Sequence, residues 1–460
     1  MELAILQAIL VGFVLVLVIE FVYRGNAQQG TPQAKTKRSG QGRTCRPDCP
    51  ACQSEGYEIE RRSRPGPRQK KKSGRPRRVN TDWHFCPDQS CSHYGWVGLG
   101  NIIANGHPNG GHWRQLHCTA CRGYFAETVG TIFYRSPLPP EKLCQIIQGL
   151  AEGWNLHSIA RVLKVEPDTV KACLVRAAEH MEAVSSYLIR DLHLSQVQVD
   201  ELWALVQSWG QDEDARTEPK TRRRQGWVWA GIDPDSKLLL ATVVGGRSLA
   251  YAQLLIHAIM LTLAPGLVPL FLSDQLAAYE TAIVTHFGHW VEVPRRSKYG
   301  PAPKPRWKPL PELNYAQVVK RRVRGRVVEV TQRVVFGSTE TITAILSHAG
   351  HKINTAFIER VNLTLRAHIP ALGRKVLSFA KTILGLTQQV SLTRTYYNFC
   401  LPHLSLRLQL PEPLPTKGNG SPKLWQSRTP AMTAGITDHV WTMQELLLFR
   451  VPPWSQEVSG

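Results

Sequence analysis

Acidic side chains are scarce in this sequence: 35 Asp and Glu residues stand against 56 Lys and Arg residues, and the formal net charge is +21. Two stretches carry this excess, because residues 31–80 hold 15 basic and 4 acidic residues and residues 295–326 hold 11 and 1. The remainder is close to neutral, which excludes a surface that is basic all over. Positive charge held in two Pro- and Gly-rich segments indicates an arm and a loop that contact a polyanion, above all nucleic acid, although a solvated tract has the same composition.

Cysteine is rare in the second half of the chain, since seven of the ten cysteines lie ahead of residue 122 in short-spaced groups. This spacing is typical of metal sites and excludes the disulfide framework of a secreted protein. Residues 83–135 contain two cysteine pairs on tight turns, separated by a stretch rich in Gly, His and Trp. Four thiolates in this pattern predict a structural zinc ribbon, with histidines of the same stretch as possible substitute ligands. The predicted zinc ligands are Cys86, Cys91, Cys118 and Cys121.

The other cysteines are less informative. Cys45, Cys49 and Cys52 form a knuckle inside the basic, flexible arm of residues 25–82, and they would hold a second metal only with a ligand from elsewhere. The last three cysteines fall in helical or apolar patterns and are expected to be ordinary buried thiols.

Apolar runs long enough to cross a membrane are absent except at residues 3–23. Glu2 precedes this run and Arg24 follows it, which is the reverse of a cleaved signal peptide. Residues 1–24 are therefore either a transmembrane helix or a buried or adventitious extension. In the first case, the positive-inside rule places the bulk of the chain in the cytoplasm, tethered to the membrane.

Residues 138–190 show the pattern of a helix-turn-helix. A helix, a break at residues 153–155, a short helix over residues 156–163 and a further helix over residues 167–182 follow one another. Pro167 suits the first turn of the last helix, and Ala160 and Val165 suit the tight core between the two helices. Lys171 and Arg176 would then lie along the helix that enters a DNA groove. Short paired helices without a DNA role have the same pattern.

Three acids lie where an acid is unexpected. Asp200 is inside the mostly apolar strand pattern QVQVDELWALVQSW, Asp274 directly follows the apolar run VPLFLS, and Glu359 is part of a helical pattern. A buried carboxylate is costly unless it is paired or metal-bound. Each acid alone also has a structural explanation: Asp274 as the cap of the next helix, the other two as partners of nearby arginines.

Residues 196–403 predict an α/β domain. Three strands in a meander, including a hairpin across residues 226–244, precede alternating helices and strands, which is the order of a ribonuclease-H-like fold. If its sheet brings the three acids together, they can hold two Mg²⁺ ions for in-line displacement at phosphorus. Residues 294–326 form a basic insertion expected to be a loop, in which Arg321 and Arg322 are expected DNA contacts. Residues 404–460 read as a Pro-rich linker and a tail without a predicted function.

The sequence words around the acids, VDELW at 199–203, LSD at 272–274 followed by Tyr279, and FIERVNLTLR at 357–366, resemble the DDE transposases of the bacterial insertion-sequence-one family. The resemblance covers roughly residues 83–403, and the basic insertion and both terminal segments depart from it. It implies that Asp200, Asp274 and Glu359 are the catalytic, magnesium-binding triad. It further implies supporting or DNA-contacting roles for Asn354, Arg360, Asn362 and Arg366.

The sequence thus predicts a multidomain protein in which a zinc ribbon and a helix-turn-helix precede a ribonuclease-H-like catalytic domain. The resemblance implies a transposase that binds the inverted-repeat ends of its element as double-stranded DNA, in a homodimer or larger synaptic assembly. It would cleave these ends and join them to target DNA with Mg²⁺ as the catalytic and Zn²⁺ as the structural metal. Two alternatives remain open: a non-catalytic DNA-binding regulator derived from a transposase, and a ribonuclease-H-like nuclease or resolvase that cleaves without joining.

Overall fold

The structure, a computed structural model, describes residues 81–454 and 456, apart from 109, 209–223, 294–303, 325, 374–377, 417, 419 and 455. The predicted apolar span at residues 3–23 and the arm with Cys45, Cys49 and Cys52 lie outside the described residues. Within the described part of the chain, no helix combines the length and the hydropathy that crossing a membrane requires.

The region of the four predicted zinc ligands is a small antiparallel sheet with few buried apolar side chains. Ile102 and Leu116 are buried beside the cysteines, and Tyr94 and Phe125 cover them only in part. Strands this short bury little apolar surface, so hydrophobic burial alone is a weak source of stability here. In sheet order the strands are β1 (Ile102–Ala104), β2 (Gln115–Cys118) and β3 (Tyr124–Ala126).

Three helices follow in the predicted order, and the predicted helix start at Pro167 is confirmed. Asn155 caps the second helix by accepting a hydrogen bond from the Ser158 backbone N–H at 2.8 Å. Lys164 ends that helix in the left-handed conformation, and Pro167 opens the third helix. The third helix continues beyond the predicted end at residue 182. The bounds are α3 (Pro140–Ala151), α4 (Leu156–Leu163) and α5 (Pro167–Leu188).

The extra turns of α5 pack against α10 (Ile383–Phe399) of the large sheet domain. Arg394 donates to Glu182 at 2.9 Å, and the hydroxyls of Ser185 and Thr395 lie 2.9 Å apart in a buried contact. One helix therefore belongs to both the helix-turn-helix region and the scaffold of the predicted catalytic domain.

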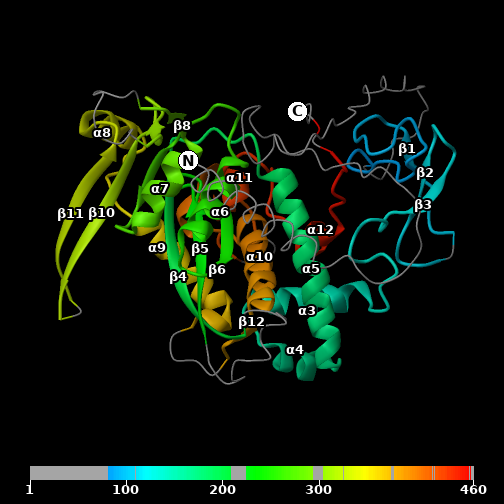
Figure 1. Ribbon diagram of the computed structural model, residues 1–460. Helices are drawn as coiled ribbons and strands as arrows, with labels where there is room; N and C mark the ends of the chain where they lie inside the picture. The colour runs from blue at the N-terminus through cyan, green and yellow to red at the C-terminus, as the bar shows by residue number, and fades with distance from the viewer. Residues whose placement is uncertain are drawn as a thin grey trace. The chain divides into compact units, whose positions relative to one another are not determined.

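The main sheet has the predicted order of a three-strand meander followed by alternating helices and strands (Figure 1). Strand β5 runs antiparallel to both β4 and β6 and forms the predicted hairpin with β6, whereas β7 and β12 pair with β4 in parallel. The strand order is β11-β10-β7-β4-β5-β6. The strands are β4 (Gln196–Ser208), β5 (Arg224–Ile232), β6 (Leu239–Gly245), β7 (Leu270–Ser273), β10 (Tyr315–Val323), β11 (Arg326–Phe336) and β12 (Ala380–Thr382).

Helices cover both faces of the sheet, and successive side chains of β4 point alternately to one face and the other. Val197 and Val199 pack in the core formed with α6 and α7, whereas Leu202 and Ala204 pack in the core formed with α9 and α10. By the same alternation, Asp200 faces the α9 side and Glu201 the α7 side. These helices, with α8 beside β10, are α6 (Leu249–Met260), α7 (Ala277–His286), α8 (Thr339–His348) and α9 (Ala356–His368).

The prediction that residues 294–326 form a loop is wrong for the described part of this stretch. Residues 306–309 form β9 (Arg306–Pro309), which pairs with β8 (Gly288–Val291), and β10 joins the main sheet beside β7 through residues 315–317. Beyond these residues β10 and β11 continue as a two-stranded hairpin that extends away from the sheet (Figure 1). Alternating valines on this hairpin favour strand structure, and the many Arg and Lys residues obscured that signal.

The C-terminal residues are also more than a tail. After the hairpin of β13 (Leu408–Leu414) and β14 (Lys423–Gln426) come α11 (Pro430–Thr433) and α12 (Met443–Leu448). Ala431 is buried in the core of the main sheet, and Leu446 and Leu447 are buried among the helices α3 to α5. Residues 429–450, here called the C-terminal strap, therefore hold the sheet domain and the helical region together.

The strap ends at the cysteine-rich sheet. The Arg450 guanidinium donates to the Phe85 carbonyl at 2.8 Å and lies over the Phe85 ring, 3.8 Å from its centroid. Burial lowers the pKa of Arg450 to about 10, so the group keeps its charge at neutral pH. Burial raises the pKa of the Cys86 thiol, and the charge of Arg450 is close enough to interact with that group.

Replacing Arg450 with methionine is expected to loosen the cysteine-rich sheet. The change keeps much of the apolar packing but leaves the buried Phe85 carbonyl without its donor, a loss of about 1–3 kcal/mol. Hydrogen exchange of residues 81–135 should rise, and zinc should leave faster in a chelator competition. Arg407→Met is the matched control, because Arg407 lies over the Trp425 ring on an exposed hairpin. Equal exchange in both variants would contradict a role for Arg450 in holding this sheet.

Candidate active site

Asp200 lies in the middle of β4, at a point where the sheet has a gap. Strand β7 pairs with β4 only at residues 196–198, and β12 pairs with it only from Val206 onward. Between these partners, among the described residues, no strand lies on that side of β4. Because β7 ends at Ser273, Asp274 follows at the carboxyl end of that strand, where parallel sheets commonly bind ligands.

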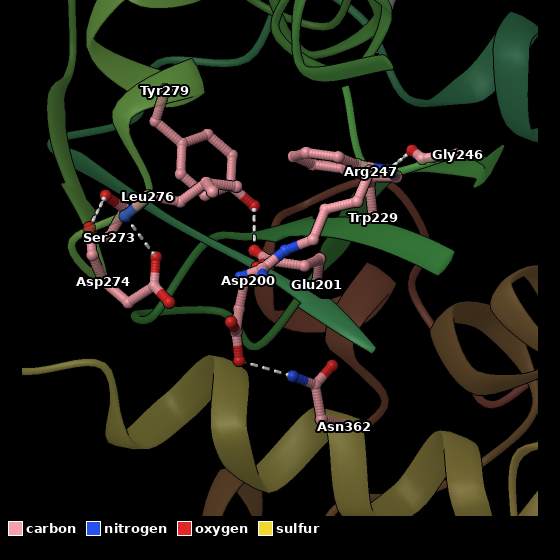
Figure 2. A network of polar contacts seen from close by, with 10 residues as sticks. All are labelled: Asp200, Glu201, Trp229, Gly246, Arg247, Ser273, Asp274, Leu276, Tyr279 and Asn362. Atoms are coloured by element: carbon pink, nitrogen blue, oxygen red, sulfur yellow. Dashed lines mark hydrogen bonds and ion pairs between the residues drawn. The ribbon is translucent and has the colours of Figure 1, made fainter. Parts of the chain in front are cut away.

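The Asp200 carboxylate is mostly buried and points to α9 (Figure 2). The Asn362 side-chain amide donates to its Oδ2 at 2.7 Å. Burial, together with the negative charges of Glu201 and Asp274, raises the pKa of Asp200 to about 7. Such a site stabilises a bound cation, because a cation would relieve the repulsion between the acids.

Asp274 binds a backbone N–H through one carboxylate oxygen, and among the described residues its other oxygen accepts no hydrogen bond. Its Oδ1 accepts a hydrogen bond from the Leu276 backbone N–H at 3.0 Å, in the turn that leads into α7. Behind it, the Ser273 hydroxyl donates to the Asp274 carbonyl at 2.7 Å and contacts the Tyr315 hydroxyl at 2.7 Å. The explanation of Asp274 as a helix cap is wrong, because the N-cap residue of α7 is Leu276 and no side chain caps this helix. The Asp274 carboxylate is fixed instead by the turn that precedes α7.

Glu201 is a third acid at this site that the sequence did not reveal. It offers a ligand oxygen together with Asp200 and Asp274, and the three oxygens all lie within 4.8 Å of one another. The Tyr279 hydroxyl donates to Glu201 at 3.1 Å, and Arg247 donates to it through Nη2 at 2.6 Å and Nε at 3.1 Å. The sequence signal that could have identified Glu201 is that it is the second of two consecutive acids inside an apolar strand.

Glu359 is not part of this acid group. It lies in the first turn of α9 with a half-exposed side chain, accepts a hydrogen bond from the Thr355 hydroxyl at 2.9 Å, and forms an ion pair with Lys320 of β10. Its negative charge is nevertheless near enough to contribute to the raised pKa of Asp200. The structure therefore brings two of the three predicted acids together and places the third on the facing helix.

The donor set of the acid group fits a hard cation. It consists of carboxylate oxygens only, which suits Mg²⁺ and not the softer transition metals. Three partly buried carboxylates face one another here, and Arg247 is the basic side chain that pairs with the group. The excess of negative charge in a confined space is what a divalent ion would neutralise.

The four predicted zinc ligands do converge. Their sulfur atoms all lie within 4.8 Å of one another, with 3.6 Å between the sulfurs of Cys86 and Cys121 and 4.0 Å between those of Cys91 and Cys118. Four Zn–S bonds of about 2.3 Å place sulfurs about 3.8 Å apart, so the group fits a tetrahedral zinc ion. The Asn101 amide donates to the Cys118 sulfur at 3.2 Å, as a partner of a thiolate would.

The predicted DNA-binding residues are scattered over several elements. Lys171 is exposed on α5, whereas Arg176 of the same helix donates to the Ile132 carbonyl at 2.6 Å. Arg321 pairs with Glu329 across the β10–β11 hairpin, and Arg322 lies beside it in β10. On α9, Arg360 is exposed, Arg366 is partly buried, and Asn354 forms turn hydrogen bonds at the helix start.

Comparison with known proteins does not identify a family for this chain. No protein-family model matches the chain, and no curated protein matches it. The chain aligns with the crystal structure of the Mos1 strand transfer complex at 13% identity over 33% of this chain and 56% of that one, with a TM-score of 0.14. The pre-cleavage Mos1 transpososome gives 12% identity over 33% and 58%, with a TM-score of 0.12. The chain thus spans little more than half of each, and TM-scores this low do not establish a common fold.

Proposed function

We propose that this chain is a Mg²⁺-dependent DNA transposase of the DDE class, with a ribonuclease-H-like catalytic domain and a DNA-binding zinc ribbon and helix-turn-helix. The observation that carries the proposal is the grouping of Asp200, Glu201 and Asp274 within 4.8 Å at the gap between β4 and β7. The sequence words shared with the insertion-sequence-one family support the finer assignment to that family.

In this proposal Asp200 and Asp274 hold the metal ions, and Asn362 keeps the Asp200 carboxylate oriented through its 2.7 Å hydrogen bond. Magnesium bound here would activate the attacking hydroxyl and stabilise the leaving 3′ oxygen. For Glu359 to serve as the third ligand, its ion pair with Lys320 has to open.

The reaction has two chemically equivalent steps. Water attacks the phosphorus at the element end, a new P–O bond forms, the bond to the 3′ oxygen breaks, and the water proton passes to solvent. The freed 3′ hydroxyl then attacks a target phosphodiester in the same way and becomes joined to it. The exposed basic residues Lys171, Arg321 and Arg360, together with Arg322 of β10, would contact the DNA backbone. Synapsis of two ends requires a dimer or larger assembly.

The test is a strand-transfer reaction with the full-length protein, the DNA that flanks its own coding sequence, a target plasmid and Mg²⁺. We expect joined products with the natural chain and none with Asp274→Ala. Cleavage without joining would replace the proposal by a nuclease or resolvase. Binding of the flanking DNA without cleavage would replace it by a regulator.

A further inference from the structure

Arg247 has an unusual position beside the acid group. It follows β6, and the Trp229 indole fixes the preceding backbone by donating to the Gly246 carbonyl at 3.0 Å. Its side chain is 44% exposed, whereas that of its partner Glu201 is 2% exposed. The guanidinium also lies over the Trp227 ring, 4.6 Å from its centroid. Arg247 is therefore held by Glu201 and by the Trp227 ring, while part of its side chain stays exposed to solvent. Figure 2 shows Arg247 beside Glu201 and the Trp229–Gly246 contact.

Arg247 has N–H donors that the described protein groups do not use and that suit a ligand. A guanidinium has five N–H donors in a fixed fork. Two of them, on Nε and Nη2, point to Glu201 Oε1. Within the part of the chain that the structure describes, the other three donate to no protein group. They remain available on the open side of the site.

The role of Glu201 follows from its partners. Its Oε1 accepts both bonds from Arg247, and its Oε2 accepts the bond from the Tyr279 hydroxyl, which lies on the fully buried Tyr279 side chain. Burial raises the pKa of Glu201, while the bonds from Arg247 and Tyr279 oppose this shift. A carboxylate with both oxygens bonded in this way is suited to orient an arginine.

We propose that Arg247 is a catalytic residue that donates to a non-bridging oxygen of the phosphodiester undergoing attack, and that Glu201 is its positioning residue. A phosphodiester entering the acid group adds negative charge to carboxylates that already repel one another. Arg247 supplies a permanent, planar cation whose fork matches two phosphate oxygens. The stacked Trp227 ring and the hydrogen bonds to Glu201 orient the Arg247 guanidinium before substrate binds. The side chain therefore needs little reorganisation during the reaction.

The proposal rests on the proposed function for the reaction, but phosphate contact can be measured without it. The variants are Arg247→Gln, Arg247→Lys and Glu201→Gln, with Arg407→Gln as the matched control because Arg407 is also stacked on a tryptophan, at 4.3 Å. The first probe is a fluorescent 40-base-pair duplex of mixed sequence, bound in Ca²⁺ over a series of salt concentrations. The second is nicking, in Mg²⁺, of a plasmid that carries the DNA flanking the coding sequence.

We expect Arg247→Gln to lower kcat for nicking by about 10²–10³-fold with a much smaller change in KM. It should also reduce the slope of log affinity against log salt by about one. Arg247→Lys should recover part of the rate, Glu201→Gln should lower it by about tenfold or more, and Arg407→Gln should match the natural chain. Binding of Mn²⁺, followed by electron paramagnetic resonance, should persist in Arg247→Gln.

Two outcomes would overturn the inference. One is a slope of log affinity against log salt that is the same in Arg247→Gln as in the natural chain, whatever the nicking rate of the variant. The other is a parallel loss of activity, Mn²⁺ binding and melting temperature, which marks a structural role. If the natural chain fails to nick DNA, the proposed function fails, while the salt slope still decides whether Arg247 contacts phosphate.

Discussion

Replacing Asp200 with asparagine should abolish Mg²⁺-dependent DNA cleavage and, at the same time, stabilise the metal-free protein above pH 7. The loss of rate should reach about 10³-fold or more, because an amide oxygen holds a divalent ion poorly at the position where charge develops. The Asn362 amide can still donate to the new side-chain oxygen, so the surrounding structure should persist.

The gain in stability follows from the direction of the pKa shift. The folded-state pKa of Asp200 is about 7, above its ordinary value of 3.8, so the folded protein keeps a proton there that the unfolded chain has already released. The contribution of this group is fully present below about pH 4 and is lost as pH rises through 7. Asparagine removes the charge, and its advantage in melting temperature should therefore be largest near pH 8 and vanish toward pH 4.

Melting curves with and without Mg²⁺ check this prediction. The natural chain should gain stability from Mg²⁺ and the Asp200→Asn variant should not, since a ligand stabilises only the state that binds it. Glu412→Gln, at an exposed carboxylate on β13, is the control that should change neither property. A variant that melts lower than the natural chain at pH 8 would contradict the burial and repulsion described for Asp200.

Removing zinc should unfold residues 81–135 while the main sheet domain stays folded. The ribbon has strands of three or four residues and a core of mainly cysteine sulfur with Ile102 and Leu116, so its apolar burial is small. Structural zinc sites contribute about 10–16 kcal/mol of apparent binding free energy. The free energy lost on zinc removal should thus exceed the free energy of unfolding that residues 81–135 have without metal.

The measurement is limited proteolysis and hydrogen exchange after chelation, with zinc content followed by mass spectrometry. Cys118→Ser should reproduce the effect of the chelator. Cys144→Ser is the matched control, because burial raises the pKa of Cys144 to about 11 and this thiol lies on α3, apart from the group of four. A chelated ribbon that retains its protease resistance would show that the four cysteines are not a structural metal site.

Sequence reasoning located Asp200 because an acid is conspicuous in a strand whose two faces are both apolar. It also predicted the helix starts at residues 156 and 167, the latter from proline geometry at the first turn. Such features are local, and the sequence displays them directly. Each of the two cysteine pairs is also local in sequence, and their predicted grouping is confirmed by the structure.

The sequence did not reveal Glu201, because neighbours on a strand face opposite sides and only Asp200 seemed free to meet Asp274. The short length of β7 changes this, since it leaves Asp274 beside both faces of β4 at once. The ion pair between Lys320 and Glu359 joins a strand and a helix whose pairing depends on the tertiary fold. The strap was missed similarly: its capping box at Thr442 is visible in sequence, but its partners are not.

The strap also has a consequence for the order in which the protein becomes functional during synthesis. Arg450 contacts Phe85 across 365 residues of chain, so a ribosome completes the ribbon's last contact long after it has made the ribbon. At about 5–20 residues per second this delay is about 20–70 s. A chain that stops short of residue 429 would carry the cysteine-rich sheet, helices α3 to α5 and the three predicted acids, with the α5–α10 contact but without the contacts that the strap adds. Synthesis thereby sets a delay between making the cysteine-rich sheet and fixing it to the rest of the chain.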